Sequence, residues 1–289
     1  MIERGFVTIA TGHERYYKMA LTLLRSYRAN TENPMPFALL CDRTNEYTEE
    51  FTDVIILEKF SKSYMDKIRL LKTAPYKETI FIDADCIVYG DLNRYWDYYQ
   101  QTTDFSCFGF CHPLDSDEGY FWRDSVGDYG NQISYIPGFH GVAYFIRRGE
   151  VCDEMYETCR AITSQYQKYK FRYFSNPADE PILALAMALH KCRPIQQAGE
   201  CFAYYPVDGR YTTFDYSKRL CRYEKDNRKH SILLMHFGSV RTTAPLYTIE
   251  ERKVHFYHKH NRNWNVLESC FGKLGCYIRY VIHRLTNRK

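Results

Sequence analysis

The 289-residue sequence lacks the features that mark membrane, secreted and fibrous proteins. No uninterrupted apolar run approaches the roughly 18–20 residues that a membrane-spanning helix needs. The residues before Phe6 lead directly into a strand-like run, without a signal-peptide pattern. Internal repeats and low-complexity tracts are also missing. We therefore expect a globular, cytoplasmic protein.

Paired cysteines are missing as well, although the chain contains 11 cysteines. No Cys-x-x-Cys pair occurs, and Cys107 with Cys111 is the nearest approach to one. Structural zinc sites usually show such pairs, and disulfides stabilise mainly small secreted domains. We expect reduced, mostly buried thiols without disulfides, with a zinc site as the alternative.

Charge is distributed unevenly along the chain. From Arg252 to Lys289 there are nine basic residues and one acidic residue, so this segment has a net charge of +8. The net charge of the whole chain is only +4. The remaining residues 1–251 therefore carry −4. The 27 tyrosines and 18 phenylalanines favour sheets over a Leu-rich helical bundle. These counts predict an acidic globular body with a basic tail.

The apolar pattern predicts an α/β fold with a mostly parallel central sheet flanked by helices. We predict loops and short strands over residues 104–140, and a division into a catalytic domain (1–250) and a basic amphipathic appendage (251–289). Strand-like runs cover residues 5–12, 35–41, 54–57, 78–83, 141–146 and 232–236. Helical periodicity covers residues 16–27, 64–74, 151–167 and 180–190.

Two carboxylates follow an apolar strand in the segment Thr79–Asp85. Asp83 and Asp85 are two positions apart, so on an extended chain both point the same way and can face one cation. Mg²⁺ and Mn²⁺ prefer such oxygen ligands. An isolated Asp-x-Asp is often only a turn. His236 ends a second apolar run, and by itself it would be interpreted as a core histidine. Together with the acidic pair, we expect it to be a third metal ligand.

The order of these motifs resembles the GT-A glycosyltransferases, and the family 8 retaining enzymes most closely, over roughly residues 5–245. The resemblance implies a Rossmann-like GT-A nucleotide-diphospho-sugar transferase fold. It implies that Asp83, Asp85 and His236 hold Mn²⁺ or Mg²⁺ against the diphosphate of a UDP-sugar. The implied activity is hexosyl transfer to a glycan or lipid-linked acceptor, as in surface polysaccharide or lipopolysaccharide-type synthesis.

The same resemblance implies further contacts with the donor. Tyr16 would stack on uracil; the alternative is that its side chain only packs on the sheet. Lys67 or Arg69 would face phosphate or sugar; the alternative is that these side chains are solvated. The family's acidic residue is missing from the Gly12-His13 turn, Phe139 replaces the family's Asn, and an Arg replaces its phosphate-binding Lys. The complete donor-binding set is Ala10, Thr11, Gly12, Tyr16, Lys67, Arg69, Asp83, Ala84, His140, Gly141, Gly238 and Arg241.

The segment Ala178–Leu183 opens a helix with two acidic residues. Helix capping accounts for one of them. The resemblance aligns the pair with the family's reaction centre, which makes Asp179 a ligand of sugar hydroxyls. Glu180 stands where the family has Gln, and a carboxylate there could act as a nucleophile or general base. Asp179 and Glu180 are our candidate catalytic residues.

The tail forms a predicted amphipathic helix over residues 265–286, with a basic end that continues to Lys289. Such a helix either lies on an anionic membrane surface or docks on the domain by its apolar stripe. We expect no nucleic-acid binding, because only the tail is basic and no binding motif accompanies it. The stripe consists of Leu267, Phe271, Leu274, Ile278, Val281, Ile282 and Leu285.

Other functions remain as alternatives to the transferase. A catalytically inactive GT-A scaffold that binds sugar nucleotides fits the altered Asn and Lys positions. A sugar-nucleotide pyrophosphorylase would need a Gly-rich phosphate loop, which the segment from Gly12 to Arg15 lacks. A nucleic-acid-binding module would rely on the tail alone.

Overall fold

The fold is that of a computed structural model of the chain. It describes residues 2–61, 63–102, 104–116, 120, 129–196, 202–204, 212–225, 228–238 and 241–286. The chain forms two compact units, each assembled from three separate segments. Unit 1 comprises Met1–Gly12, Met35–Asp83 and Trp96–Gln197, and unit 2 comprises His13–Pro34, Ala84–Tyr95 and Ala198–Lys289.

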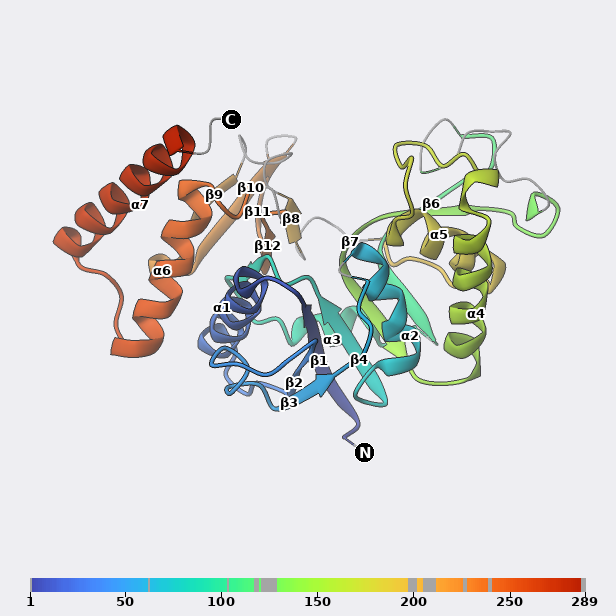
Figure 1. The fold of residues 1–289 in the computed structure, drawn as a ribbon, viewed down its shortest axis with the longest axis horizontal. Coiled ribbons are helices and arrows are strands. Elements are labelled where there is room, and N and C mark those ends of the chain that lie inside the picture. Colours follow the sequence, from blue (N-terminus) through green and yellow to red (C-terminus); the bar gives the residue numbers. More distant parts are fainter. Residues whose placement is uncertain are drawn as a thin grey trace. The chain divides into compact units, whose positions relative to one another are not determined.

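Unit 1 is built on a six-stranded sheet with the strand order β3-β2-β1-β4-β7-β6 (Figure 1). Strands β1 to β4 are parallel, whereas β7 is antiparallel to β4 and β6 is antiparallel to β7. The predicted α/β fold with a mostly parallel sheet is therefore confirmed. The strands are β1 (Arg4–Ala10), β2 (Phe37–Cys41), β3 (Asp53–Ile56), β4 (Glu78–Ile82), β6 (Phe105–His112) and β7 (Ile136–Arg147).

Helices cover this sheet and complete unit 1. In α5 every residue from Pro181 to Ala188 is buried, and the helix packs against β7 and α4. A helix that is apolar on all sides belongs in an interior, so α5 is firmly held and positions its first two residues. The helices are η1 (Tyr64–Arg69), α2 (Leu70–Thr73), α4 (Glu150–Ser164), η3 (Tyr166–Lys168) and α5 (Asp179–Leu189), while α3 (Arg94–Tyr99) leads from unit 2 into unit 1.

The parallel strands bring their carboxyl ends to one edge of the sheet. β2 is buried along its whole length, and β4 is buried from Thr79 to Ile82, which explains their continuous apolar runs. β1, β2 and β4 end at Ala10, Cys41 and Ile82. Ligands of open α/β sheets bind outside this edge, and Asp83 directly follows β4 there.

Unit 2 contains two three-stranded sheets, helix α1 and the two C-terminal helices α6 and α7. In the first sheet β12 is central, antiparallel to β5 and parallel to β8. The second sheet is antiparallel throughout. The elements are α1 (Glu14–Asn30), β5 (Cys86–Val88), β8 (Phe202–Tyr204), β9 (Thr212–Asp215), η5 (Tyr216–Lys218), β10 (Leu220–Lys225), β11 (Arg228–Ser231), β12 (Leu234–His236), α6 (Pro245–His260) and α7 (Val266–Thr286).

Helix α1 confirms the helix predicted over residues 16–27. It packs against elements from both of the other segments of unit 2. It begins after His13, whose Nδ1 accepts a hydrogen bond from the Arg15 N–H. Its apolar face packs against β5 and α6. Thr22 Oγ1 lies 2.9 Å from Nε2 of His255 in α6, so residues far apart in sequence share one interior.

Two sequence-based expectations differ from the structure. Residues 104–140 contain more regular structure than expected, because β6 and the first part of β7 pair there. The first five residues of β6 are all buried, so the alternation that reveals a half-exposed strand is missing. A domain boundary after residue 250 would cut α6 where Glu250, Glu251 and Lys253 are buried. α6 is thus an internal part of unit 2, and only α7 remains as a candidate appendage.

Helix α7 packs against α6 and against Trp264, whose ring also contacts Phe256 of α6. A Cβ atom on Gly272 would lie 2.4 Å from the Trp264 ring, so only glycine permits this close packing. Cys276 is the one buried residue of α7, and one helical turn separates it from Gly272. The two glycines in the predicted tail helix therefore do not interrupt it, and Gly272 instead forms part of its contact face. Residues 287–289, which the sequence assigns to the tail, lie outside the described residues.

Candidate active site

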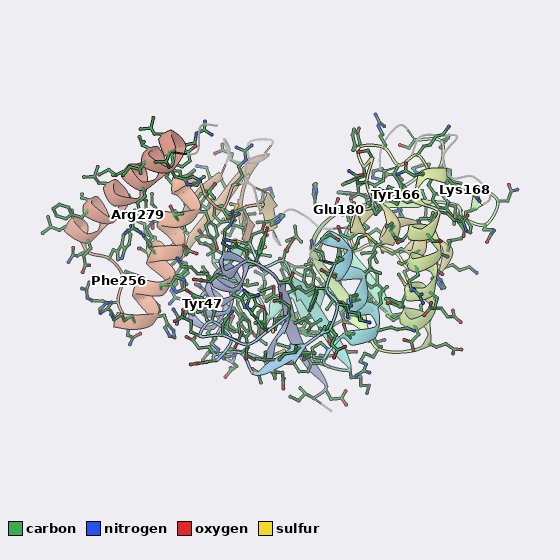
Figure 2. All side chains as sticks on the ribbon, viewed as in Figure 1. Tyr47, Tyr166, Lys168, Glu180, Phe256 and Arg279 are labelled. Carbon is green, nitrogen blue, oxygen red and sulfur yellow. The ribbon has the colours of Figure 1, made fainter. Side chains whose placement is uncertain are left out.

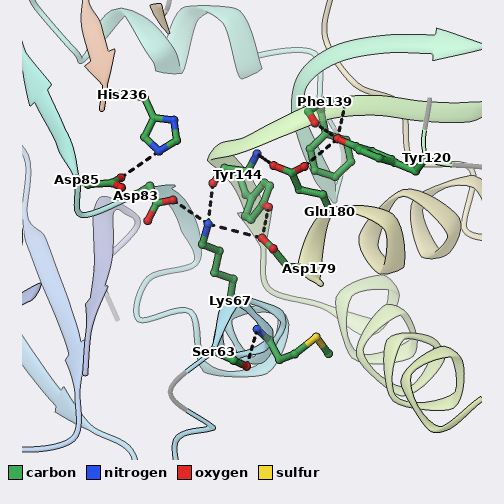
Figure 3. Close-up of polar contacts among 12 residues, drawn as sticks. Ser63, Lys67, Asp83, Asp85, Tyr120, Phe139, Tyr144, Asp179, Glu180 and His236 are labelled. Carbon is green, nitrogen blue, oxygen red and sulfur yellow. Dashed lines mark hydrogen bonds and ion pairs between the residues drawn. The ribbon is translucent and has the colours of Figure 1, made fainter. Parts of the chain in front are cut away.

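Four predicted site residues meet in unit 1 around the side chain of Lys67 (Figure 3). Lys67 Nζ donates a hydrogen bond to Asp83 Oδ2 at 2.8 Å and lies 3.6 Å from Asp179 Oδ2. It also donates to the carbonyl oxygen of Gly141 at 3.0 Å. One cation thus joins carboxylates from the end of β4 and the start of α5, and Glu180 follows Asp179 directly.

The charge on Lys67 is stabilised by these acidic neighbours. Burial alone would lower the pKa of its ammonium group, but Asp179 and Asp83 outweigh burial and raise the pKa well above its usual range. Lys67 therefore stays protonated at any physiological pH. It keeps a positive charge at the edge of the sheet, where an anionic ligand would bind.

The two acidic residues of α5 are held by separate hydrogen bonds. The hydroxyl of Tyr144 donates to Asp179 Oδ2 at 2.8 Å, and the N–H of Gly141 donates to Glu180 Oε1 at 2.6 Å. A Cβ at position 141 would lie 2.7 Å from the Tyr144 hydroxyl oxygen and 3.1 Å from Asp179 Oδ2. Glycine is therefore required at 141 for β7 to approach the acidic pair.

Glu180 is the more perturbed of the two carboxyl groups. Burial raises its pKa, and the neighbouring charge of Asp179 raises it further. The N–H of Gly141, the charge of Lys67 and the hydroxyl of Tyr120 oppose this rise without cancelling it. A carboxylate with a raised pKa is a stronger base than an ordinary glutamate, which is the property that a general base needs.

Two tyrosines at this site are not predicted from the sequence. The Tyr120 hydroxyl donates to the carbonyl oxygen of Phe139 and lies 3.2 Å from Glu180 Oε2. Tyr144 lies in the strand-like run 141–146, where it reads only as a core residue, and it is 1% exposed. Nothing distinguishes either residue from the other tyrosines among the chain's 27. Burial raises the pKa of both hydroxyls well above the usual range, so both remain hydrogen-bond donors.

A second cluster of predicted residues forms in unit 2. His236 Nε2 lies 3.0 Å from Asp85 Oδ1, and the N–H of Phe237 donates to the Asp85 carbonyl at 3.1 Å. Both side chains are nearly buried and offer one nitrogen and one oxygen donor, which suits a divalent cation. The third predicted ligand, Asp83, belongs to unit 1, so the predicted set of three is divided between the units and its assembly stays a prediction.

The turn at Gly12, which belongs to the predicted donor-binding set, contains an interaction that the sequence pattern does not reveal. Gly12 has a φ of 76°, a conformation that favours glycine. Its N–H donates to Asp42 Oδ2 at 3.1 Å, and Arg43 donates to its carbonyl at 2.7 Å. Asp42 follows β2, so an acidic group reaches the turn from a neighbouring strand. Ala10 and Thr11 precede it at the end of β1.

Other predicted donor contacts lie outside the Lys67 cluster. The Arg69 guanidinium donates to the carbonyls of Glu58 and Lys59, and so holds a loop of unit 1. Its predicted contact with phosphate or sugar thus has no support here. His140 is exposed and Ala84 is buried.

The remaining predicted positions lie in unit 2. Tyr16 is 38% exposed on α1. The exposed Arg241 donates its N–H to the carbonyl of Gly238 at 2.8 Å. The φ of Gly238 is 67°, which again favours glycine. Residues 239–240 between them lie outside the described part of the chain.

Comparison with known proteins relates the chain to glycosyltransferases by structure alone. No protein-family model matches the sequence, and no curated protein sequence matches it. A structure of the galactosyltransferase LgtC in complex with donor and acceptor sugar analogues superposes with a TM-score of 0.56 at 15% identity, covering 93% of this chain and 99% of LgtC. An active-site mutant of LgtC with Glu in place of Gln gives the same TM-score at 16% identity.

A second type of enzyme shares the architecture. Mouse xyloside xylosyltransferase 1 superposes with a TM-score of 0.51 at 10% identity, over 83% of this chain and 99% of that enzyme. Identities this low establish the fold and leave the activity to be argued from the site. The chain therefore has the GT-A glycosyltransferase fold that its motifs predict.

Proposed function

We propose that this chain is a glycosyltransferase that moves a sugar from a nucleotide-diphosphate donor, a UDP-sugar, to a glycan or lipid-linked acceptor. The cluster of Lys67, Asp83, Asp179 and Glu180 at the carboxyl edge of the unit 1 sheet carries this proposal. The LgtC complex with donor and acceptor sugar analogues supports it, because the same fold accommodates both kinds of ligand there.

The acidic pair of α5 has two roles in this proposal. Asp179 accepts hydrogen bonds from sugar hydroxyls with the oxygen that Tyr144 does not use, and Tyr144 fixes its orientation. Glu180, with its raised pKa, acts as the nucleophile or the general base. The LgtC mutant shows that a glutamate in place of an active-site glutamine is compatible with this fold.

A divalent cation, Mn²⁺ or Mg²⁺, completes the proposal, with Asp83, Asp85 and His236 as its ligands. The donor chemistry of these residues fits, since carboxylate oxygens suit both ions and a neutral imidazole can complete the coordination of Mn²⁺. Such an ion neutralises the charge of a departing diphosphate. Lys67 and Arg241 add positive charge for the same anion.

The test is transfer or hydrolysis of nucleotide sugars by the purified chain with Mn²⁺, with Mg²⁺ and with excess EDTA. We expect turnover with a UDP-sugar that EDTA removes and that Asp83→Ala abolishes without loss of the folded circular dichroism spectrum. Glu49→Ala, at an exposed carboxylate, serves as the control and should keep full activity. Full activity of Asp83→Ala, or full activity in EDTA, would refute the metal-dependent mechanism.

The same assay separates the catalytically inactive scaffold from an enzyme. A scaffold would bind a UDP-sugar in calorimetry and show neither hydrolysis nor transfer with any acceptor. Binding that Asp83→Ala removes, together with no turnover in the wild type, would favour the scaffold.

Helix α7 carries an apolar surface that no other described part of unit 2 covers. Its predicted stripe is exposed throughout, from 49% at Ile278 to 71% at Phe271. The stripe lies on the side of the helix opposite to Gly272, which packs against Trp264, and to the buried Cys276. Within unit 2 the stripe therefore does not dock on a neighbouring element. The exposed apolar residues are Val266, Leu267, Phe271, Leu274, Tyr277, Ile278, Val281, Ile282 and Leu285.

We propose that this surface lies in the interface of an anionic membrane. Lys273 and Arg284 flank the apolar stripe on one side and Arg279, labelled in Figure 2, flanks it on the other, which complements acidic lipid headgroups. None of the helices within the described residues is long and apolar enough to cross a bilayer. Attachment parallel to the surface would bring a lipid-linked acceptor near the enzyme.

A further inference from the structure

The cluster in unit 2 contains a third donor atom that the proposed metal role does not use. β5 and β12 are antiparallel, and their register places Cys86 directly opposite His236. Directly opposed residues project their side chains to the same face of a sheet. One ligand atom each from Asp85, Cys86 and His236 all lie within 4.8 Å of one another.

These three donors are enclosed by the protein. Cys86 is 0% exposed, Asp85 5% and His236 9%. Within the described residues, this is the one group of three or more His, Cys, Asp or Glu side chains close enough to hold a metal ion. One nitrogen, one oxygen and one sulfur donor form a set typical of zinc sites, whereas Mn²⁺ prefers oxygen.

We infer that Cys86 supplies a thiolate ligand beside Asp85 and His236, so that this site also accepts Zn²⁺ and binds it through sulfur more tightly than it binds Mn²⁺. This inference deepens the proposed metal role, because it concerns the same Asp85 and His236. Binding of the cation displaces the Cys86 thiol proton to solvent, as metal binding to a cysteine requires.

The sequence pattern could not reveal this donor set. Cysteine zinc sites are usually recognised by two cysteines a few residues apart, and Cys86 has no such neighbour. Its partner His236 is distant in sequence, and only the pairing of β5 with β12 brings the two together. At Cys86 the inference therefore favours the zinc alternative over an inert buried thiol.

The test measures metal binding without turnover. The wild-type chain loaded with Co²⁺, a spectroscopic substitute for Zn²⁺, should show an intense near-ultraviolet charge-transfer band from thiolate to metal. Cys86→Ser should lose this band and should lower Zn²⁺ affinity at least about ten-fold, with little change in Mn²⁺ affinity. Cys221→Ser, at another buried strand cysteine of unit 2, should keep both the band and the affinity.

If the Cys86→Ser variant fails to fold, a second measurement on the wild type still tests the inference. X-ray absorption spectroscopy of the Zn²⁺-loaded wild type should show a sulfur neighbour at about 2.3 Å from the metal. A shell of nitrogen and oxygen alone, or a Co²⁺ spectrum unchanged in folded Cys86→Ser, would overturn the inference. Mn²⁺-dependent transfer accompanied by such a result would leave the proposed transferase standing.

Discussion

Gly141 has the most constrained backbone position beside the acidic pair. Gly141→Ala places a methyl group 2.7 Å from the Tyr144 hydroxyl oxygen and 3.1 Å from Asp179 Oδ2, so these groups must move. We expect a loss of about 1–3 kcal/mol in unfolding free energy, together with a large fall in kcat. Urea unfolding and transfer kinetics measure the two effects.

A matched glycine gives the control for this substitution. A Cβ on Gly149, before α4, would meet nothing within 4 Å. Gly149→Ala should therefore meet no steric clash and lower the unfolding free energy by at most about 1 kcal/mol, the cost of Ala at a helix N-cap. Equal effects of the two substitutions would contradict the tight packing around the acidic pair.

Glu180 makes stability depend on pH in a defined direction. Its pKa is raised in the folded state, so ionisation disfavours folding, and stability is lost as pH rises from the unfolded pKa through the folded one. Glu180→Gln removes this loss. We expect the variant to unfold at a higher temperature than the wild type at about pH 8, and the difference to vanish near about pH 4.

The activity of the same variant tests the role of the carboxylate. If Glu180 is the nucleophile or base, Glu180→Gln loses kcat, and the wild-type rate falls as pH decreases through the raised pKa. Glu49→Gln, at an exposed position, should show neither the thermal nor the kinetic effect. A Glu180→Gln variant that is less stable than the wild type at alkaline pH would show that its hydrogen bonds outweigh the cost of burial.

At the scale of single elements, α7 offers a comparison within one helix. Gly272→Ala would bring a Cβ 2.4 Å from the Trp264 ring, whereas the nearest atom to a Cβ on Gly275 is Arg252 Nη1 at 3.6 Å. We expect Gly272→Ala to weaken the contact between α7 and α6, and Gly275→Ala to stabilise the helix by up to about 1 kcal/mol. Hydrogen exchange of residues 266–286 measures both.

The expected exchange patterns are opposite. Amides of α7 should exchange faster in Gly272→Ala and no faster in Gly275→Ala than in the wild type. Identical behaviour of the two variants would mean that the small residues of α7 do not determine its contact with α6.

The predictability of each element follows from how it is buried. α1 and α5 were recognisable because one shows a clear helical period and the other a continuous apolar run with acids at its start. Asp83 and Asp85 were recognisable because an apolar strand ends abruptly in acid. The hydroxyls of Tyr120 and Tyr144 were not, because their partners come from other segments and a buried tyrosine looks the same whatever it bonds. Cys86 escaped for the same reason.

At the scale of the whole molecule, the sequence could not show that the chain forms two units from interleaved segments. A linear reading searches for one boundary, whereas α1 leaves unit 1 at His13 and the chain returns there at Met35. The uneven charge was visible from composition, and the structure adds that the basic helix α7 also carries the exposed apolar surface.

Membrane attachment by this helix is testable with the full chain. We expect cosedimentation with vesicles of phosphatidylcholine and phosphatidylglycerol, weaker in high salt and weaker with phosphatidylcholine alone, since each basic residue contributes about 1 kcal/mol near an anionic surface. Phe271→Glu with Ile278→Glu should abolish it. Ile56→Glu, at a 56% exposed residue of β3, should not.

Two results would contradict this attachment. The double variant could sediment with anionic vesicles as the wild type does. Alternatively, sedimentation equilibrium could show a wild-type dimer that the double variant dissociates, which would assign the surface to a second copy of the chain.

The contact between α1 and α6 also determines when the protein can fold during synthesis. α1 is complete once residue 30 has been made, but its partner His255 is added more than 200 residues later. At about 5–20 residues per second, the part of the apolar face of α1 that packs against α6 stays uncovered for on the order of ten seconds or more. Unit 2 is therefore assembled only after nearly the whole chain has left the ribosome, and a nascent chain that stops before α6 exposes the face of α1 to aggregation and to chaperones.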